Sequence, residues 1–345
     1  MHQTHTWPHG MGHPQALIAT ARRGLASVAL GVAFTAWSYI CFAGTWSERP
    51  ASEWLEKMAR ASQSLNYDGT FVYRNGDRME SMRIIHRATP GGERERMFSL
   101  TGAAREVLRD SEKVTCILPD NRSVVVTKSR PRSVTLRVFD PQDGFAKHYD
   151  LSSQPGERVA GRKTALIKVK PKDEYRYGYR LWLDRVTGLL LKSELVGDGG
   201  RALEQIVYTD IKMPAYIPDE LLEPAISGEG FTWYTDSDPM TPAAMENANA
   251  WSVGWLPRGF EMTDRVIDPS SLSRMPIEHL VYTDGLASVS VFIERLSSAA
   301  EGIDGHSNMG AINAYGRVLG DHQITVVGEV PSITVERVAD SVQRR

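Results

Sequence analysis

Cysteine is nearly absent from this 345-residue sequence, which has only Cys41 and Cys116. Residues 1–43 are expected to be a removable targeting segment, so Cys116 would stand alone in the remainder and no disulfide could form within it. Cys116 lies in an apolar run, which predicts a buried and unreactive thiol.

Motifs for catalysis are lacking as well. The sequence has no phosphate-binding loop and no dinucleotide fingerprint, and its histidines are scattered without metal-ligand spacing. The segment Gly305–Gly310 comes near the Gly-x-Ser-x-Gly pattern of hydrolases, but Met309 occupies the position of the second glycine. We therefore expect no enzyme activity, no metal and no cofactor. A secreted lipid hydrolase is disfavoured because the sequence offers no nucleophile–base pair.

The first 43 residues have the pattern of a secretory signal peptide. Arg22 and Arg23 precede the uncharged stretch Gly24–Phe42, and Cys41 and Ala43 place small residues at the two cleavage-determining positions before the expected cleavage after Ala43. A periplasmic mature protein is therefore expected. An uncleaved membrane anchor is the alternative, because the stretch approaches spanning length. Whether Met1 or Met11 is the initiator stays open.

Neither sign of charge is in large excess. Without residues 1–43, the chain has 38 Lys and Arg against 42 Asp and Glu, a formal charge of −4. This balance does not favour a nucleic-acid partner. The remaining length, about 300 residues, is enough for two domains with their own cores.

Strand patterns dominate residues 44–215. A helix is predicted at 52–65, with Ser52 as its cap, and 141–161 is expected to be helical or irregular. Strands are predicted at 67–74, 79–87, 94–100, 105–109, 114–118, 123–128, 134–139, 165–170, 175–184, 189–195 and 202–211. So many strands at steady spacing indicate one large, curved antiparallel sheet.

A boundary is predicted after this region. Residues 213–257 have no Lys or Arg, seven acids and several prolines, which excludes a central strand or a helix interior. We expect an extended acidic linker at 216–250. Its aromatic residues are candidates to dock on a domain: Phe231, Trp233 and Tyr234.

Residues 251–345 indicate a smaller α+β domain. One hairpin is predicted from 278–283 and 286–294 around Asp284-Gly285, and a second from 313–319 and 323–328. A C-terminal helix is expected at 331–342.

Five segments in this order resemble the MucB/RseB family of periplasmic regulators: Tyr67–Tyr73, Arg105–Arg109, Tyr175–Gly188, Tyr282–Glu294 and Ile324–Pro331. The resemblance implies a β-rich α+β protein. Its large domain would be a half-open antiparallel β-barrel wrapped on helices, similar to lipoprotein carriers and holding an apolar cavity. The family's small domain helps to grip the periplasmic segment of an anti-sigma-E factor of RseA/MucA type. The regulator shields that factor from the first regulatory protease, and lipopolysaccharide or a related lipid relieves the block.

Candidate lipid-binding residues follow from the apolar pattern and the resemblance. Side chains that could line the cavity are Phe71, Tyr73, Met82, Ile84, Leu118 and Trp182. An ordinary core is the alternative, because side chains and bound lipid fill a curved sheet by the same burial of apolar area. Arg130 and Arg132 belong to a short basic run that could meet lipid phosphates or could be a solvated loop.

Candidate partner-binding residues lie in the first small-domain hairpin: Tyr282, Asp284, Ser290 and Phe292. Alternation puts Val289, Val291 and Ile293 on the core face and Phe292 on the other. We expect Phe292, together with Tyr282, to contact the anti-sigma segment or the large domain. Packing of Phe292 against the C-terminal helix is the alternative.

A lipid or lipoprotein carrier without a signalling role is the competing function. The second domain argues against it, since simple carriers resemble only residues 44–215. Assembly as a homo-oligomer is left open.

Overall fold

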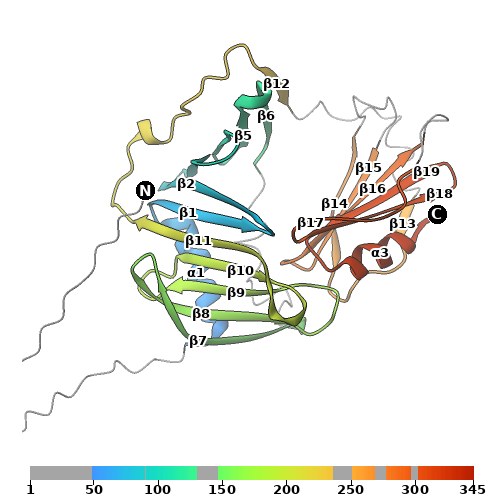
Figure 1. Cartoon of the computed structure of the whole chain (residues 1–345), viewed down its shortest axis with the longest axis horizontal. Helices are drawn as coiled ribbons and strands as arrows, with labels where there is room; N and C mark the ends of the chain where they lie inside the picture. The colour runs from blue at the N-terminus through green and yellow to red at the C-terminus, as the bar shows by residue number, and fades with distance from the viewer. Residues whose placement is uncertain (1–48, 90, 130–146, 236–250, 269–276, 297–301) are drawn as a thin grey trace, which may run out of the picture. The chain divides into compact units, whose positions relative to one another are not determined.

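The computed structural model describes residues 49–89, 91–129, 147–235, 251–268, 277–296 and 302–345. Residues Trp46–Arg345 form one compact unit that contains two large sheets, both mainly antiparallel (Figure 1). No helix among these described residues is long and apolar enough to span a membrane. The predicted signal segment lies outside the described residues.

The larger sheet has twelve strands in the order β12-β6-β5-β4-β3-β2-β1-β11-β10-β9-β8-β7. Its strands are β1 (Tyr67–Asn75), β2 (Arg78–Thr89), β3 (Gly92–Ser99), β4 (Glu106–Arg109), β5 (Lys113–Leu118), β6 (Ser123–Lys128), β7 (Tyr149–Val159), β8 (Arg162–Pro171), β9 (Gly178–Asp184), β10 (Leu190–Val196), β11 (Ala202–Lys212) and β12 (Thr232–Thr235). The two end strands do not pair, so the sheet stays open. The predicted strand-rich α+β class and half-open barrel are confirmed.

Helix α1 (Ala51–Ser64) lies against one face of this sheet, behind β8–β11 in Figure 1. Leu55 and Met58 are 1% exposed and pack on the strands, because the helical period places them on one face. The predicted cap was wrong. The helix starts after Pro50, which has no side-chain capping bond, and Ser52 lies within the first turn.

Strand β7 corrects the expectation for 141–161, since Tyr149–Val159 is a strand. It is the end strand of the sheet, and its pairing with β8 is irregular between Pro155 and Arg158. Proline fits at such an edge because an edge strand does not need every backbone N–H for pairing. The strand expected at 134–139 lies outside the described residues.

Residues 213–235, here called the strap, run from β11 to β12 along the face of β2–β6 opposite α1. Ile217 and Leu222 are 1% and 2% exposed and pack against Ile85 and Phe98. The strap then contributes β12, which pairs in parallel with β6. This part of the expected linker therefore packs on the large sheet, while 236–250 lies outside the described residues.

The smaller sheet has six strands in the order β14-β15-β16-β19-β18-β17. They are β14 (Glu261–Asp268), β15 (Ile277–Thr283), β16 (Ser288–Arg295), β17 (Gly305–Met309), β18 (Ile312–Leu319) and β19 (His322–Gly328), with helix α3 (Ser332–Asp340) and the short pair β13 (Trp251–Val253) and β20 (Val342–Arg344) beside them. Both predicted hairpins and the C-terminal helix are confirmed. β14 and β17 were missed, and β17 is the segment that had come near the hydrolase pattern.

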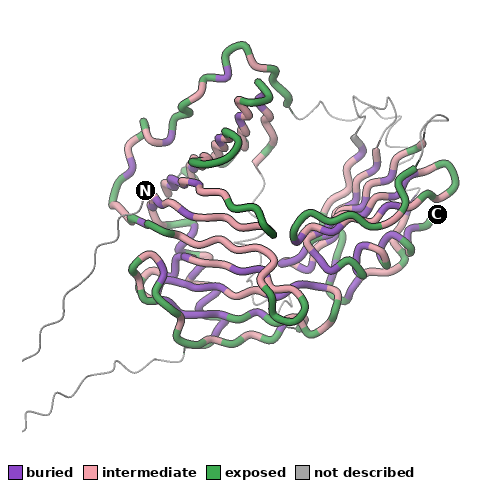
Figure 2. The backbone as a smooth tube through the Cα atoms, in the orientation of Figure 1, coloured by how far each residue is buried: buried purple, intermediate pink, exposed green. Residues whose placement is uncertain are grey.

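The core of the small domain lies between this sheet and α3. Val289, Val291 and Ile293 are at most 2% exposed and pack with Val335 and Val338 of the helix. Figure 2 shows the buried positions alternating with partly exposed ones along β15 and β16. The predicted core face of β16 is confirmed.

Candidate functional site

A continuous apolar row crosses the face of the large sheet that carries α1, here called the helix face. Phe71 pairs with Met82 across β1 and β2, and Ile84 pairs with Met97 of β3. Directly paired residues share a sheet face. Phe71, Met82 and Ile84 are 6%, 3% and 8% exposed and share a core cluster with Ala61 of α1. Three predicted lipid-site residues thus belong to the packed core between α1 and the sheet.

The row continues past the helix toward the open end of the sheet. Met97 pairs with Val107, which pairs with Cys116, which pairs with Val125. These side chains are half-buried, and so is the predicted Leu118 two residues along β5. We call Val107, Cys116, Leu118 and Val125 the apolar strip. Burial raises the pKa of the Cys116 thiol, so it is protonated at neutral pH, although it is less buried than expected.

Two other predicted residues lie differently. Tyr73 is on the helix face, half-buried, and burial together with the charge of Glu204 raises its pKa to about 12. Trp182 pairs with Lys192, whose ammonium lies 4.1 Å from the ring centroid. Lys192 pairs with Val207 of β11, and Val207 pairs with Val72 of β1. Because Val72 precedes Tyr73 on the same strand, Trp182 lies on the opposite face of the sheet from Tyr73.

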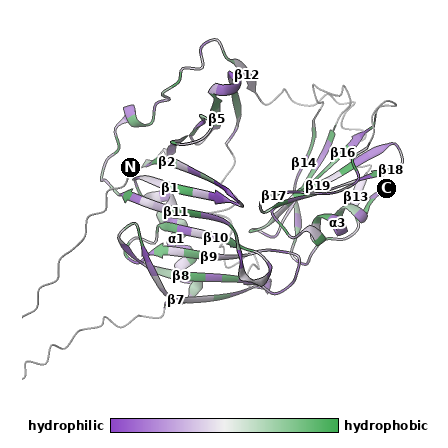
Figure 3. Cartoon of the chain, viewed as in Figure 1, coloured by the Kyte–Doolittle hydropathy of each residue, from purple (hydrophilic) through white to green (hydrophobic). Residues whose placement is uncertain are grey.

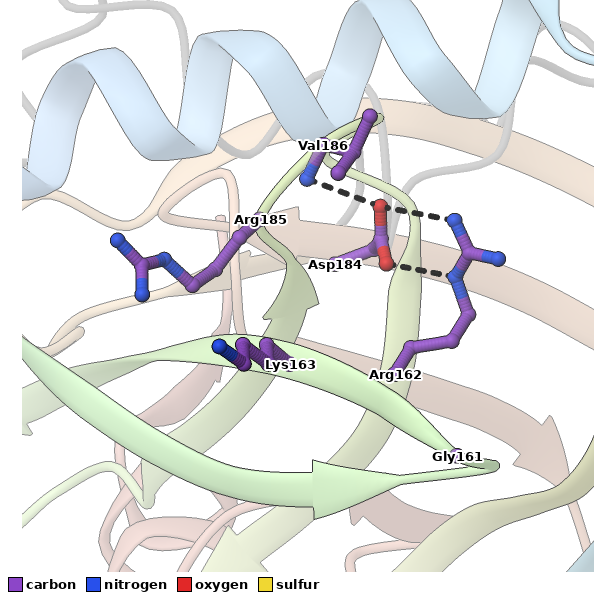
Figure 4. A pocket seen from close by; sticks show the side chains of 6 residues that line it. All are labelled: Gly161, Arg162, Lys163, Asp184, Arg185 and Val186. Carbon is purple, nitrogen blue, oxygen red and sulfur yellow. Dashed lines mark hydrogen bonds and ion pairs between the residues drawn. The ribbon is translucent and has the colours of Figure 1, made fainter. Parts of the chain in front are cut away.

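Arg130 and Arg132 lie outside the described residues. A basic hollow of about 530 Å³ is found elsewhere, between the β7–β8 and β9–β10 turns (Figure 4). In it the Arg162 guanidinium donates to Asp184 over 2.6 Å, and the backbone N–H of Val186 donates to the same carboxylate. Burial opposes the charge of Asp184, but hydrogen bonds from Arg162 and from the backbone and hydroxyl of Thr187 outweigh it, and the pKa of Asp184 is lowered. Arg162 and Asp184 are therefore engaged with each other, while Lys163 and Arg185 also line the hollow.

The four predicted partner residues do not form one surface. Tyr282 pairs with Val289 and is 6% exposed in the core beneath α3. Phe292 pairs with His279, the two rings stack at 4.2 Å, and Phe292 is half-buried on the opposite face, beside Ser290. Tyr282 and Phe292 therefore do not share a face, and Phe292 does not pack on α3. Figure 3 colours the chain by hydropathy; in β16 the run Val291–Ile293 is apolar on both faces, so burial and register, not hydropathy, separate the two faces there.

Asp284, the fourth, is buried between the two domains. Its carboxylate pairs with Arg176 of the large domain, and neither side chain has any exposed area. Tyr149 donates a hydrogen bond of 2.9 Å to the same carboxylate. Arg176 also donates to the carbonyl of Arg258 over 2.8 Å. A carboxylate engaged in this way joins the domains and is closed to a solvent-side partner.

Sequence reasoning missed that the tyrosine-rich segment forms the junction. Residues Tyr175–Tyr177, here called the docking segment, precede β9 and contact the small domain. The Tyr175 carbonyl accepts from Thr334 (2.9 Å), and its ring meets Trp255 edge-on at 5.0 Å. The Tyr177 hydroxyl accepts from Asn313 (3.0 Å). The sequence signal that could have indicated this junction is Arg176 between Tyr175 and Tyr177, because Arg and Tyr are enriched at binding interfaces.

The two domains match known family models. Residues 50–226 match the MucB/RseB N-terminal domain and residues 245–343 the MucB/RseB C-terminal domain. The chain is 36% identical over 300 residues to the sigma factor AlgU regulatory protein MucB of Pseudomonas aeruginosa, covering 85% of this chain and 90% of that protein. It is 26% identical to the sigma-E factor regulatory protein RseB of Escherichia coli, covering 88% and 94%. These relatives are named as regulatory proteins.

Solved structures agree over the same length. The Pseudomonas aeruginosa MucA/MucB complex superposes with a TM-score of 0.69 at 34% identity, covering 86% of this chain and 99% of that one. A crystal structure of MucB in complex with MucA(peri) gives 0.67 at 34% identity with the same coverage.

Proposed function

The chain belongs to the MucB/RseB family, and on that premise we propose that it binds the periplasmic segment of an anti-sigma factor of MucA/RseA type. The observation that carries the proposal is the 34% identity over 86% of the chain to a MucB bound to MucA. The export signal at 1–43 supports a periplasmic location, with cleavage after Ala43.

The outer face of the small sheet is the proposed anchor for this partner. Phe292 and Ser290 lie on the face that α3 leaves uncovered, and a half-buried aromatic ring is a frequent binding anchor. Bound there, the regulator would cover the anti-sigma segment and shield it from the first regulatory protease.

A substitution at Phe292 tests the proposed binding of the anti-sigma segment. Phe292→Ser should weaken binding of the purified anti-sigma segment by roughly tenfold or more, since aromatic anchors carry a large share of interface energy. Tyr216→Ser removes an aromatic that is 67% exposed on the strap and serves as the matched control. Calorimetric titration measures the affinity, and thermal melting shows whether the fold survives. Equal affinities in the two variants would remove Phe292 from the interface.

The apolar strip is the proposed lipid contact, and bound lipid would lower the affinity for the anti-sigma segment. Ile84 is a poor probe because it packs in the core beside α1, so a charge there would unfold the domain. Leu118→Asp places the charge on the half-buried strip, and Thr115→Asp places it on the other face of the same strand. Native mass spectrometry with lipopolysaccharide should show weaker loading for Leu118→Asp alone. Equal loading of both variants and the parent would place the lipid elsewhere.

A further inference from the structure

Carboxylates from both domains lie at the junction, since Glu329 follows Gly328, which pairs with Asn313 near Gly310, and Gly310 adjoins Asn75. Glu204 lies in β11 of the large sheet, and Asn75 donates a hydrogen bond of 2.9 Å to it. The small domain reaches the same point, because any side chain at Gly310 would collide with the amide of Asn75. Glu204 thus stands at the edge of the domain contact.

Glu329 brings the second carboxylate. It lies between the end of β19 and Val330, whose carbonyl accepts from Asn313 over 2.8 Å. The same Asn313 amide donates to Tyr177 of the docking segment, so the backbone beside Glu329 is tied to the large domain. Tyr177 and Ala311 also share a buried cluster with Leu195.

The groups that face this pair are acidic or neutral. Tyr73 of β1 forms a hydrogen bond with Glu204. On the β9 side, the charge of Glu329 contributes to raising the pKa values of Tyr177 and Tyr179. The other charges that act on these tyrosines are those of the carboxylates Asp198 and Asp284. The nearest cation on β1, Arg74, is turned to the carbonyls of Gly76 and Ala202. Within the described ranges, no Lys, Arg or His forms an ion pair with Glu204 or Glu329.

We propose that Glu204 and Glu329 form a pH-sensitive contact, which holds the small domain on the large one while one carboxyl group is protonated and loosens when both are ionised. Two like charges in a partly buried contact repel each other strongly, since the low local dielectric screens them little. A protonated carboxyl removes that repulsion. The proposal requires neither the anti-sigma segment nor a lipid.

The direction of the pH effect follows from linkage. Burial first, and the charge of Glu204 second, raise the pKa of Glu329 from 4.5 to about 7. Between these values the docked state binds more protons than the undocked state, so docking weakens as pH rises and levels off above about 7. One pKa unit is tenfold in an equilibrium constant. Because Glu329 is partly exposed, docking should weaken on the order of tenfold to 100-fold between pH 5 and pH 8.

Trp255 offers a direct measure of docking, since Tyr175 of the large domain covers its ring edge-on. The full mature chain carrying 5-fluorotryptophan is followed by fluorine NMR from pH 5 to pH 8.5, with the Trp255 signal assigned by Trp255→Phe. The wild type should shift from the docked toward the undocked signal as pH rises, and the change should level off above about pH 7. Glu329→Gln and Glu204→Gln should stay docked throughout.

Glu261→Gln is the matched control, because Glu261 is an exposed glutamate on the same domain. It should follow the wild type. A wild-type signal that does not change with pH would overturn the proposal. A Glu329→Gln variant that titrates like the wild type would overturn it as well. If Glu329→Gln fails to fold, the Glu204→Gln variant of the large domain serves as the test. A pH response of Glu204→Gln equal to that of the wild type would then contradict the proposal.

Discussion

Asp284 is the residue on which the junction depends most. Asp284→Ala would leave the Arg176 guanidinium, which has no exposed area, with Asp173 as its remaining carboxylate. Removing one partner of a buried pair costs about 3–5 kcal/mol, and the remaining Asp173 favours the lower end, about 3 kcal/mol. Urea unfolding monitored by circular dichroism measures this loss.

The exposed pair Arg295–Asp321 supplies the control for that measurement, since its side chains are 63% and 54% exposed. Asp321→Ala should cost much less stability than Asp284→Ala, because water already screens this carboxylate. If both variants lost the same stability, the buried junction would not depend on the ion pair.

These residue contacts set the limit of what the sequence could predict. Arg176 and Asp284 are 108 positions apart, and no local pattern marks two distant charges as partners. Phe292 was assigned to the correct face because strand alternation is local. Tyr282 was assigned to the wrong face for lack of register, since only its pairing with Val289 places it in the core.

At the scale of elements, hairpins were predictable and edges were not. The turn at Gly76-Asp77 fixes β1 and β2 locally, since Gly76 takes the positive φ of +58° that the turn needs. β7 escaped prediction because Pro155 and Gly156 are turn residues, and only its position as an end strand makes them acceptable. Proline density suggested a linker at the strap, while its two apolar anchors, Ile217 and Leu222, were spaced too irregularly to predict packing.

The strap should detach when an anchor is made polar. Leu222→Asp would put a charge at a site that is 2% exposed between Ile85 and Phe98. Burying an unpaired charge is unfavourable, so we expect a loss of about 3 kcal/mol and release of residues 213–235. Limited proteolysis with mass spectrometry should then find new cleavage sites within the strap.

Glu220→Gln, at an exposed position on the same segment, tests whether charge change alone has this effect. It should leave the proteolysis pattern unchanged. A strap that stays protected in Leu222→Asp would mean that the ion pairs of Arg87 and Arg94 with Asp219 hold it without the apolar anchor.

At the scale of the whole molecule, the two domains meet through a contact that combines the buried pair Arg176–Asp284 with apolar packing, since Leu286 of the small domain lies in the core beside α1. Such a contact can adopt alternative states more readily than a single packed core, and a lipid can shift them only through unequal affinity for the two states. The proposed lipid strip lies on the large domain and the proposed partner face on the small one. The docking segment, Tyr149 and Asn75 all contact the small domain, so each is a route by which the two sites can be coupled.

Thermodynamic linkage makes this coupling measurable from both sides. If lipid weakens binding of the anti-sigma segment by some factor, the segment must weaken lipid binding by the same factor. Titrations of each ligand in the presence of the other should give equal factors. Tyr177→Ala removes a side chain that is 9% exposed at the junction and lies in neither proposed site. Each ligand alone should therefore still bind to the variant. The factor by which one ligand weakens binding of the other should fall toward one. Tyr216→Ser, away from the junction, should keep it. A factor unchanged by Tyr177→Ala would show that the two sites communicate by another route, and the docking segment would then be structural support only.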